Sequence, residues 1–195
     1  MKIGIFGGSF NPPHKMHYQI GKECMNQGYL DRVIYVPTGN HYKYKNNLLC
    51  DQLRYEMLSL LIAGETRMEV SDFELKDHVV YTYETLEYMK KKYPNDEIYF
   101  ICGVDNLSYL DTWKNGQSIL ENTKLLVIKR DTHNIEPILK KLRKYRNHIV
   151  VVNIPLNNIS STIIREKLKK QEDVGDYLPK KIESYIKKHH LYQGK

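Results

Sequence analysis

Short apolar runs alternate with longer amphipathic stretches along the 195 residues of the chain. Six runs, most of them continuous and rich in Val and Ile, have the pattern of strands buried on both faces of a parallel sheet. These runs are residues 3–6, 33–36, 68–70, 98–101, 125–128 and 149–152. Between them, stretches such as 53–63 and 83–93 carry their apolar residues on one helical face. This alternation predicts right-handed βαβ crossovers and an α/β fold with a doubly wound parallel sheet.

The last part of the chain has a different pattern, which predicts helices. Ser160 or Ser161 is suited to cap a helix that runs to about Lys169. Leu178 and Pro179 then open a last helix, because proline is tolerated where a helix begins. No repeat, low-complexity tract or convincing linker divides the sequence. We therefore predict one domain over residues 1–195, with a helical C-terminal portion at about 160–195.

The first seventeen residues contain the clearest candidate site. The first apolar run breaks at Gly7-Gly8, where the backbone can take positive φ and approach a ligand closely. Pro12-Pro13 sets up a turn that delays the next helix until after the second proline. His14 and His17 then lie at i and i+3, so both rings face the same side of that helix. A helix N-terminus with two imidazoles predicts a polyphosphate site; a βα turn with two surface histidines is the alternative.

The net charge of +7 favours anionic partners such as phosphorylated ligands. A nucleic acid would also suit this charge, but the lysines are dispersed along the chain. The lysine runs at 90–92, 140–141 and 187–188 lie in helix-like stretches, where a solvated face is the ordinary explanation. We therefore expect small phosphorylated ligands and no nucleic acid.

Cysteine use and hydropathy predict a cytoplasmic protein. Cys24, Cys50 and Cys102 are scattered and form no CxxC pair, which argues against a disulfide framework or zinc knuckle and for a reducing compartment. No stretch approaches the ~20 apolar residues that a membrane span needs. The first residues run directly into a predicted strand, so we expect no signal peptide and no membrane partner.

Four segments resemble one enzyme family. Residues 7–17 resemble the (H/T)xxH signature of the nucleotidylyltransferase superfamily, and residues 159–165 resemble its ISSTxxR signature. Residues 81–86 and 103–113 are similar to their counterparts in bacterial nicotinate-nucleotide adenylyltransferases. The resemblance covers essentially the whole chain. It implies a Rossmann-like nucleotidyltransferase fold, and transfer of the adenylyl group of ATP to nicotinate mononucleotide, giving deamido-NAD and pyrophosphate in NAD biosynthesis.

The resemblance also implies which residues bind ATP. His14, His17 and Arg165 would be catalytic, as donors to phosphate oxygens on which charge accumulates. The implied ATP-binding residues are Gly7, Gly8, Ser9, Phe10, Gly103, Asp105, Ser160, Ser161 and Thr162. No protein ligand set for a metal is implied; Mg²⁺ would be carried by the ATP phosphates.

A second group would bind the mononucleotide. Trp113 would stack on the pyridine ring, and Thr82 and Thr85 would donate to the nicotinate carboxylate. Lys43 or Lys45 would hold the phosphate, with help from Arg54. The chain departs from the family at Met16, where glycine is usual. It departs again in the loop 39–45, where a Pro-Pro-His-Lys type of sequence is usual.

Several alternatives stay open at the level of sequence. Asp105 can be a helix cap, Trp113 a core residue, and Ser160 an ordinary N-cap beside a surface Arg165. The acceptor can be nicotinamide mononucleotide, phosphopantetheine or a CTP-dependent alcohol phosphate. A non-catalytic nucleotide- or RNA-binding module is the alternative outside the enzymes, and the sequence leaves open whether the chain forms a homo-oligomer.

Overall fold

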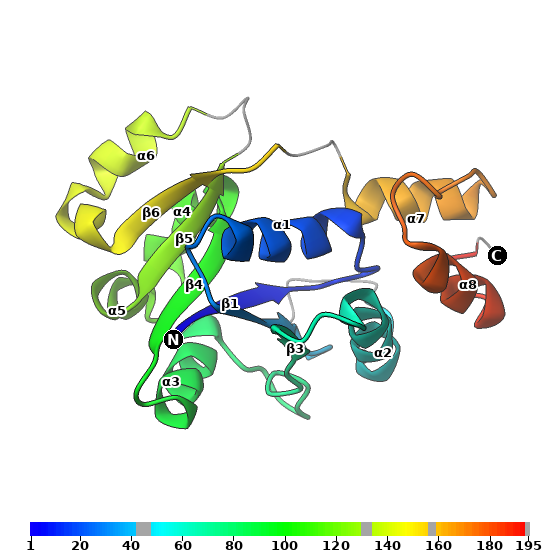
Figure 1. Cartoon of the computed structure of the whole chain (residues 1–195), viewed down its shortest axis with the longest axis horizontal. Helices are drawn as coiled ribbons and strands as arrows, with labels where there is room; N and C mark the ends of the chain where they lie inside the picture. Colours follow the sequence, from blue (N-terminus) through cyan, green and yellow to red (C-terminus); the bar gives the residue numbers. More distant parts are fainter. Residues whose placement is uncertain (42–47, 130–133, 156–158, 194–195) are drawn as a thin grey trace.

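The computed structural model describes residues 1–41, 48–129, 134–155 and 159–193 (Figure 1). Its centre is an all-parallel sheet in the order β3-β2-β1-β4-β5-β6. The strands are β1 (Lys2–Gly8), β2 (Arg32–Pro37), β3 (Met68–Val70), β4 (Glu97–Gly103), β5 (Lys124–Lys129) and β6 (Ile149–Asn153). Each predicted apolar run is a strand, so the doubly wound sheet is confirmed. The strand order reverses between β1 and β4, where such sheets bind ligands.

Helices cover both faces of the sheet. One face packs against α1 (Lys15–Asn26) and α2 (Asp51–Ile62), and the other against α3 (Thr82–Lys92), α4 (Val104–Tyr109), α5 (Gly116–Asn122) and α6 (Glu136–Lys141). Two short 3₁₀ helices, η1 (Leu110–Thr112) and η2 (Arg143–His148), complete the second layer. The C-terminal helices α7 (Ser161–Lys169) and α8 (Lys180–Lys188) lie beyond the carboxyl end of β1 (Figure 1). No helix within the described ranges is long and apolar enough to cross a membrane.

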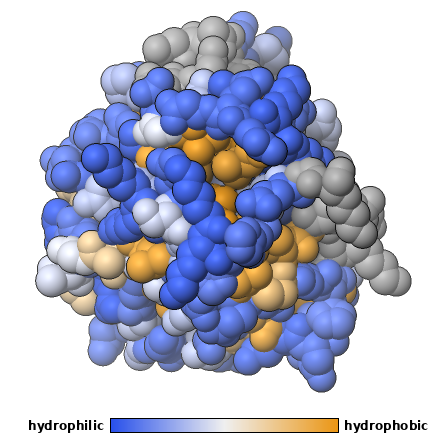
Figure 2. Space-filling view, turned by 90° about the vertical axis from the view of Figure 1, so that its right-hand side faces the viewer, coloured by the Kyte–Doolittle hydropathy of each residue, from blue (hydrophilic) through white to orange (hydrophobic). Residues whose placement is uncertain are grey.

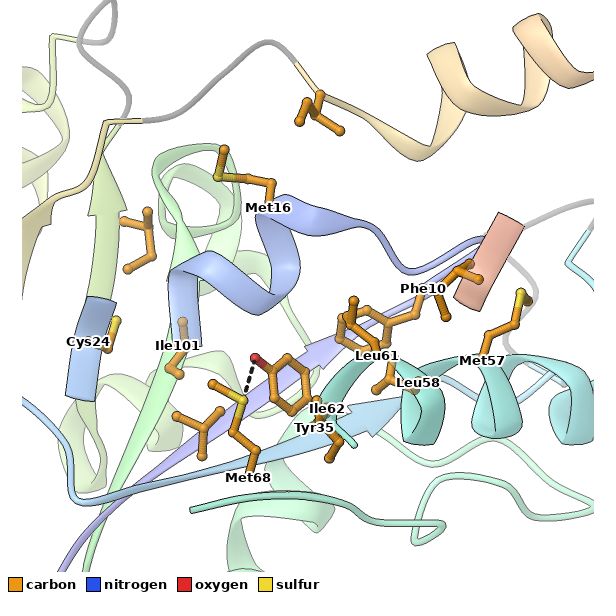
Figure 3. Close-up of a cluster of buried hydrophobic side chains, with 14 of the residues drawn as sticks. Phe10, Met16, Cys24, Tyr35, Met57, Leu58, Leu61, Ile62, Met68 and Ile101 are labelled. Carbon is orange, nitrogen blue, oxygen red and sulfur yellow. Dashed lines mark hydrogen bonds between the residues drawn. The ribbon is translucent and has the colours of Figure 1, made fainter. Parts of the chain in front are cut away.

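The packing of α1 on the sheet follows from two residues. Tyr35 of β2 is fully buried, and its hydroxyl lies within hydrogen-bond distance of two acceptors, the carbonyl of His17 at 2.9 Å and the sulfur of Met68 at 3.7 Å. Figure 3 shows the contact with Met68. Gly21 makes this approach possible, because a Cβ there would lie 2.3 Å from the Tyr35 hydroxyl. The first turn of α1, which carries the histidines, is therefore fixed to the core of the sheet.

The turn after β1 differs from the prediction at its glycines. Gly7 and Gly8 are the last residues of β1, and the left-handed backbone falls on Phe10, with φ 46°. Gly8 leaves room for the buried Phe10 ring instead, since a Cβ there would lie only 3.0 Å from that ring. The Asn11–Pro12 peptide bond is cis, and α1 begins at Lys15, just after the two prolines as predicted.

The predicted C-terminal helices are both present. Ser160 caps α7 by accepting a hydrogen bond from the amide of Ile163 at 3.2 Å. Pro179 precedes the first residue of α8. The helix α8 buries Ile182 and Ile186 in the same core cluster as α1 and α2, so the C-terminal segment is part of the packed structure.

Candidate active site

Among the described residues, one cavity opens on each face of the sheet at its carboxyl edge. Successive residues of a strand point to opposite faces, so Ile5 and Gly7 line one cavity and Phe6 lines the other. The histidine cavity, of about 290 Å³, is lined by Phe6, His14, Met16, His17, Ile20, Cys102, Gly103, Ile128, Ile159, Ser160 and Ser161. The tryptophan cavity, of about 170 Å³, is lined by Ile5, Gly7, Gly8, Thr38, Glu74, Val80, Thr82, Thr85, Leu86, Phe100, Asn106 and Trp113.

The two cavities lie on either side of the switch in strand order. Gly7 and Gly103 both lie at strand ends beside that switch, and they line different cavities. Figure 2 views the end of the molecule formed by α7 and α8, where most of the surface is hydrophilic and hydrophobic residues gather towards the middle. A ligand that occupies both cavities must cross the carboxyl ends of β1 and β4.

The two histidines form a stacked pair at the start of α1. Their ring centroids lie 3.7 Å apart with an interplanar angle of 24°. The backbone N–H of His14, the N-cap residue, donates to Nδ1 of His17 at 3.2 Å. Burial, and then the neighbouring His14, hold the pKa of His17 well below its usual range. The His17 ring is therefore neutral near pH 7, and because Nδ1 accepts, its proton is on Nε2 and available to a ligand.

The start of α7 is joined to the loop that precedes α1. The Ser161 hydroxyl donates to the carbonyl of Pro12 at 2.9 Å. Arg165, one turn along α7, donates from Nη1 to the carbonyl of Asn11 at 2.8 Å and from Nη2 to the Thr162 hydroxyl at 3.2 Å. The structure thus brings the two predicted phosphate-binding segments together, although some 150 residues of sequence separate them. The amides at two helix N-termini and a forked guanidinium are suited to phosphate oxygens.

The tryptophan cavity combines an apolar wall with the N-terminus of α3. Trp113 packs edge-on against Phe100, with ring centroids 6.3 Å apart. Thr82 is the first residue of α3 and lines the cavity. The Thr85 hydroxyl, one turn further, donates to the buried carboxylate of Glu74 at 2.7 Å. A flat ring with a polar substituent fits such a site, since aromatic faces stack on rings and helix N-termini attract anions.

Arg54 has a different place from the one predicted. Its guanidinium is fully buried and donates to the carbonyls of Ser9, Thr38 and Leu49, at distances of 2.6–3.0 Å. It also donates to the side chains of Asn40 and Asp51. Burial lowers the pKa of Arg54, while the carboxylate of Asp51 opposes that shift. These contacts use the guanidinium to hold the loops around the site together, so the expected contact with a mononucleotide phosphate is corrected to a structural role.

The remaining predicted residues are spread over the same edge. Asp105 is exposed on the first turn of α4, and the next residue, Asn106, lines the tryptophan cavity. Met16, the departure from the family, is buried and lines the histidine cavity, and Figure 3 shows it on the first turn of α1. Lys43 and Lys45 lie outside the described residues.

Sequence reasoning missed three polar residues of the tryptophan cavity. They are Thr38, Glu74 and Asn106. Thr38 follows the end of β2, a position that the rule on strand carboxyl ends indicates. Glu74 lies in an irregular segment with no periodic signal, so nothing in the sequence pointed to it. Within the described ranges, no three His, Cys, Asp or Glu side chains are grouped so that they could hold a metal ion.

An open parallel sheet with two helix N-termini, paired histidines and an arginine at its switch point is the architecture of a nucleotide-binding α/β protein. Residues 5–167 match the model of the cytidylyltransferase-like family. The chain belongs to this family and, within it, to the nicotinate-nucleotide adenylyltransferases, because relatives with that name are similar over nearly the full length.

Two such relatives are named "Probable nicotinate-nucleotide adenylyltransferase". The one from Clostridium tetani is 40% identical and the alignment covers 98% of this chain and 99% of the relative. The one from Clostridium acetobutylicum is 39% identical and covers 98% of each chain. Among solved structures, Plasmodium falciparum nicotinic acid mononucleotide adenylyltransferase complexed with NaAD is similar in fold, with a TM-score of 0.83 at 24% identity, over 98% of this chain and 97% of that one.

Proposed function

We propose that the chain transfers the adenylyl group of ATP to nicotinate mononucleotide, producing deamido-NAD and pyrophosphate for NAD biosynthesis in the cytoplasm. The observation that carries the proposal is the meeting of the starts of α1 and α7 beside His14 and His17. The relatives named above support the same reaction. The histidine cavity then takes the nucleotide of ATP, and the tryptophan cavity takes the pyridine ring.

The reaction is a displacement at phosphorus. An oxygen of the mononucleotide phosphate attacks the α-phosphorus of ATP, the bond to the α,β-bridging oxygen breaks, and pyrophosphate leaves with that electron pair. Nε2–H of His17 donates to an α-phosphate oxygen, where negative charge increases in the transition state. Arg165 and the amides at the start of α7 hold the leaving pyrophosphate. No covalent intermediate on the protein is needed, so positioning and charge stabilisation account for catalysis.

Mg²⁺ enters this proposal as part of the ATP complex. The side chains at the two helix N-termini are hydrogen-bond donors, which suit phosphate oxygens better than a hard cation. Mg²⁺ commonly binds through substrate phosphates and water, and its charge would neutralise the triphosphate. We expect activity to depend on added Mg²⁺ and to be lost with a chelator.

Nicotinamide mononucleotide is the second candidate acceptor, and one observation favours it. The Thr85 hydroxyl donates its hydrogen to Glu74, so its oxygen presents only acceptor capacity to the cavity. An amide N–H can use that acceptor, whereas a carboxylate cannot. The N-terminus of α3 and Thr82 favour the carboxylate, because amide and hydroxyl groups there can donate to it.

A pyrophosphate-release assay with ATP and a panel of acceptor phosphates tests the proposal. The panel contains nicotinate mononucleotide, nicotinamide mononucleotide and phosphopantetheine, with CTP as the alternative nucleotide. We expect release with ATP and nicotinate mononucleotide, and deamido-NAD as the product by mass spectrometry. Absence of release with every combination would contradict the proposed reaction.

A further inference from the structure

The chain turns back sharply after α8 and returns to the loop that joins β1 to α1. His190 has a left-handed backbone, with φ 51°, and the amide of Leu191 donates to the carbonyl of Ile186 at 3.0 Å. This is the Schellman arrangement, in which a left-handed residue ends a helix and the next apolar residue packs on its last turn. Leu191 is buried accordingly. The reversal places Tyr192, the next residue, next to the loop that joins β1 to α1.

Tyr192 contacts that loop through a hydrogen bond to the Asn11 side chain. Its hydroxyl donates to Oδ1 of Asn11 at 2.7 Å, across 181 positions of the sequence. The tyrosine is partly buried, and burial raises its pKa although Arg165 and Arg54 oppose the shift. The hydroxyl therefore stays protonated and keeps its hydrogen for the amide oxygen. The same oxygen accepts from the amide of Leu49 at 3.3 Å, just before α2.

Asn11 in turn holds the arginine of the site. The residue is buried, and its backbone carbonyl accepts from Nη1 of Arg165 at 2.8 Å. Its side chain and its carbonyl are thus held by different partners: Tyr192 fixes the first, and Arg165 binds the second. A backbone movement at Asn11 would displace the carbonyl that orients the guanidinium, and the bond from Tyr192 to the Asn11 side chain opposes such a movement.

We propose that Tyr192 is a positioning residue for adenylyl transfer, acting through Asn11 on Arg165. The inference rests on the proposed function for the role of Arg165 in holding pyrophosphate. The Tyr192 hydroxyl touches no substrate in this account. It restricts the loop between β1 and α1 so that the guanidinium is already oriented when ATP binds, which lowers the cost of ordering it.

Tyr192→Phe tests the inference, because it removes the hydroxyl and keeps the ring. Loss of one such hydrogen bond corresponds to about a fivefold effect. We expect kcat/KM for ATP to fall by about that factor, with KM for the acceptor unchanged. Tyr185→Phe is the matched control, since Tyr185 lies on α8 and donates to Glu56 of α2 instead. Equal kinetics for Tyr192→Phe and the wild type, or equal losses in both variants, would overturn the proposal.

A double variant separates positioning from general destabilisation. If Tyr192 acts through Arg165, then Tyr192→Phe lowers kcat/KM less in an Arg165→Lys background than in the wild type, because coupled residues are not additive. Additive losses would reject the link. Affinity for a non-hydrolysable ATP analogue, measured by calorimetry in the same variants, is the second readout. It distinguishes failure of this inference from failure of the proposed reaction, which would appear as a wild-type chain that releases no pyrophosphate.

Discussion

The hydroxyl of Thr85 donates a 2.7 Å hydrogen bond to the carboxylate of Glu74, in the wall of the cavity that Trp113 also lines. Both side chains are buried, so the carboxylate depends on donors within the protein. We expect Thr85→Val to lower the free energy of unfolding by about 1–3 kcal/mol, because a buried acceptor loses a donor. Urea denaturation measures this. Thr85→Ser keeps the hydroxyl and should remain close to the wild type, and equal loss in both variants would show that the bond is unimportant.

The sheet could be predicted from the sequence because its strands are buried on both faces. Short runs rich in Val, Ile and Leu, such as 33–36 and 125–128, are suited to strands covered on both faces, and each is a strand. The caps of α7 and α8 were equally readable, since Ser160 and Pro179 act through local backbone geometry. Apolar runs and capping residues therefore predicted the strands and helix starts, because these features depend on neighbours in the sequence.

The role of Arg54 and the conformation of the turn after β1 could not be predicted, because they depend on contacts between residues distant in the sequence. Arg54 was expected to bind a phosphate, but its guanidinium is enclosed by carbonyls from three separate segments, and no periodicity shows that convergence. Glycine was expected to take the left-handed backbone conformation in the turn after β1, yet Phe10 takes it. Its ring packs in the core against His17, with the two ring centroids 4.9 Å apart. In both cases tertiary packing decided between locally acceptable choices.

Replacement of His17 by alanine should reduce kcat by about 10²–10³-fold, the scale of losing one preorganised donor to a transition state. The reason is that Nε2–H contacts an oxygen whose charge grows during the reaction, so KM for ATP should change much less. Steady-state kinetics with varied ATP measures both constants. His189→Ala, at the end of α8, is the control histidine. Near-normal turnover in a folded His17→Ala protein would remove His17 from the catalytic residues.

The low pKa of His17 makes stability depend on pH. Burial holds the folded-state pKa well below the value of about 6.5 for an unfolded histidine. Below that pH the unfolded chain binds more protons than the folded chain, so the free energy of unfolding falls as the pH falls, by up to about 1.4 kcal/mol per pH unit for this group. Urea denaturation at about pH 7.5 and at about pH 5.5 gives the difference in the free energy of unfolding between the two pH values. His17→Asn should reduce the difference, and an unchanged difference would assign it to other groups.

Removal of the Arg54 guanidinium should strongly destabilise the fold. Arg54→Met leaves the carbonyls of Ser9 and Thr38 without this donor and leaves Asp51 without its cation, for an expected loss of about 3–5 kcal/mol in the free energy of unfolding. Arg32→Met is the matched control, because Arg32 pairs with Glu69 in a partly exposed ion pair, which should contribute about 1 kcal/mol or less. Chemical denaturation compares the variants. A stable Arg54→Met protein with weakened mononucleotide binding would restore the phosphate-binding role.

The choice of acceptor follows from donors and acceptors in the tryptophan cavity. With the Thr85 hydrogen directed to Glu74, the donors available to the nicotinate group include Thr82 and the amides at the start of α3. A carboxylate accepts from these groups with charge assistance, whereas an amide leaves part of them unpaired. The lost interaction is worth about 1.5–3 kcal/mol, so kcat/KM for nicotinate mononucleotide should exceed that for nicotinamide mononucleotide by roughly tenfold to a hundredfold.

Paired kinetics with the two mononucleotides test this preference and its cause. Thr82→Val removes the hydroxyl at the start of α3 and should lower the ratio of the two kcat/KM values, mainly by weakening the nicotinate compound. Thr85→Ser keeps the bond to Glu74 and should leave the ratio unchanged. If Thr85→Val lowers the ratio and Thr82→Val does not, the carboxylate is held by Thr85 after all. In that case Glu74 must give up the Thr85 hydrogen when the substrate binds.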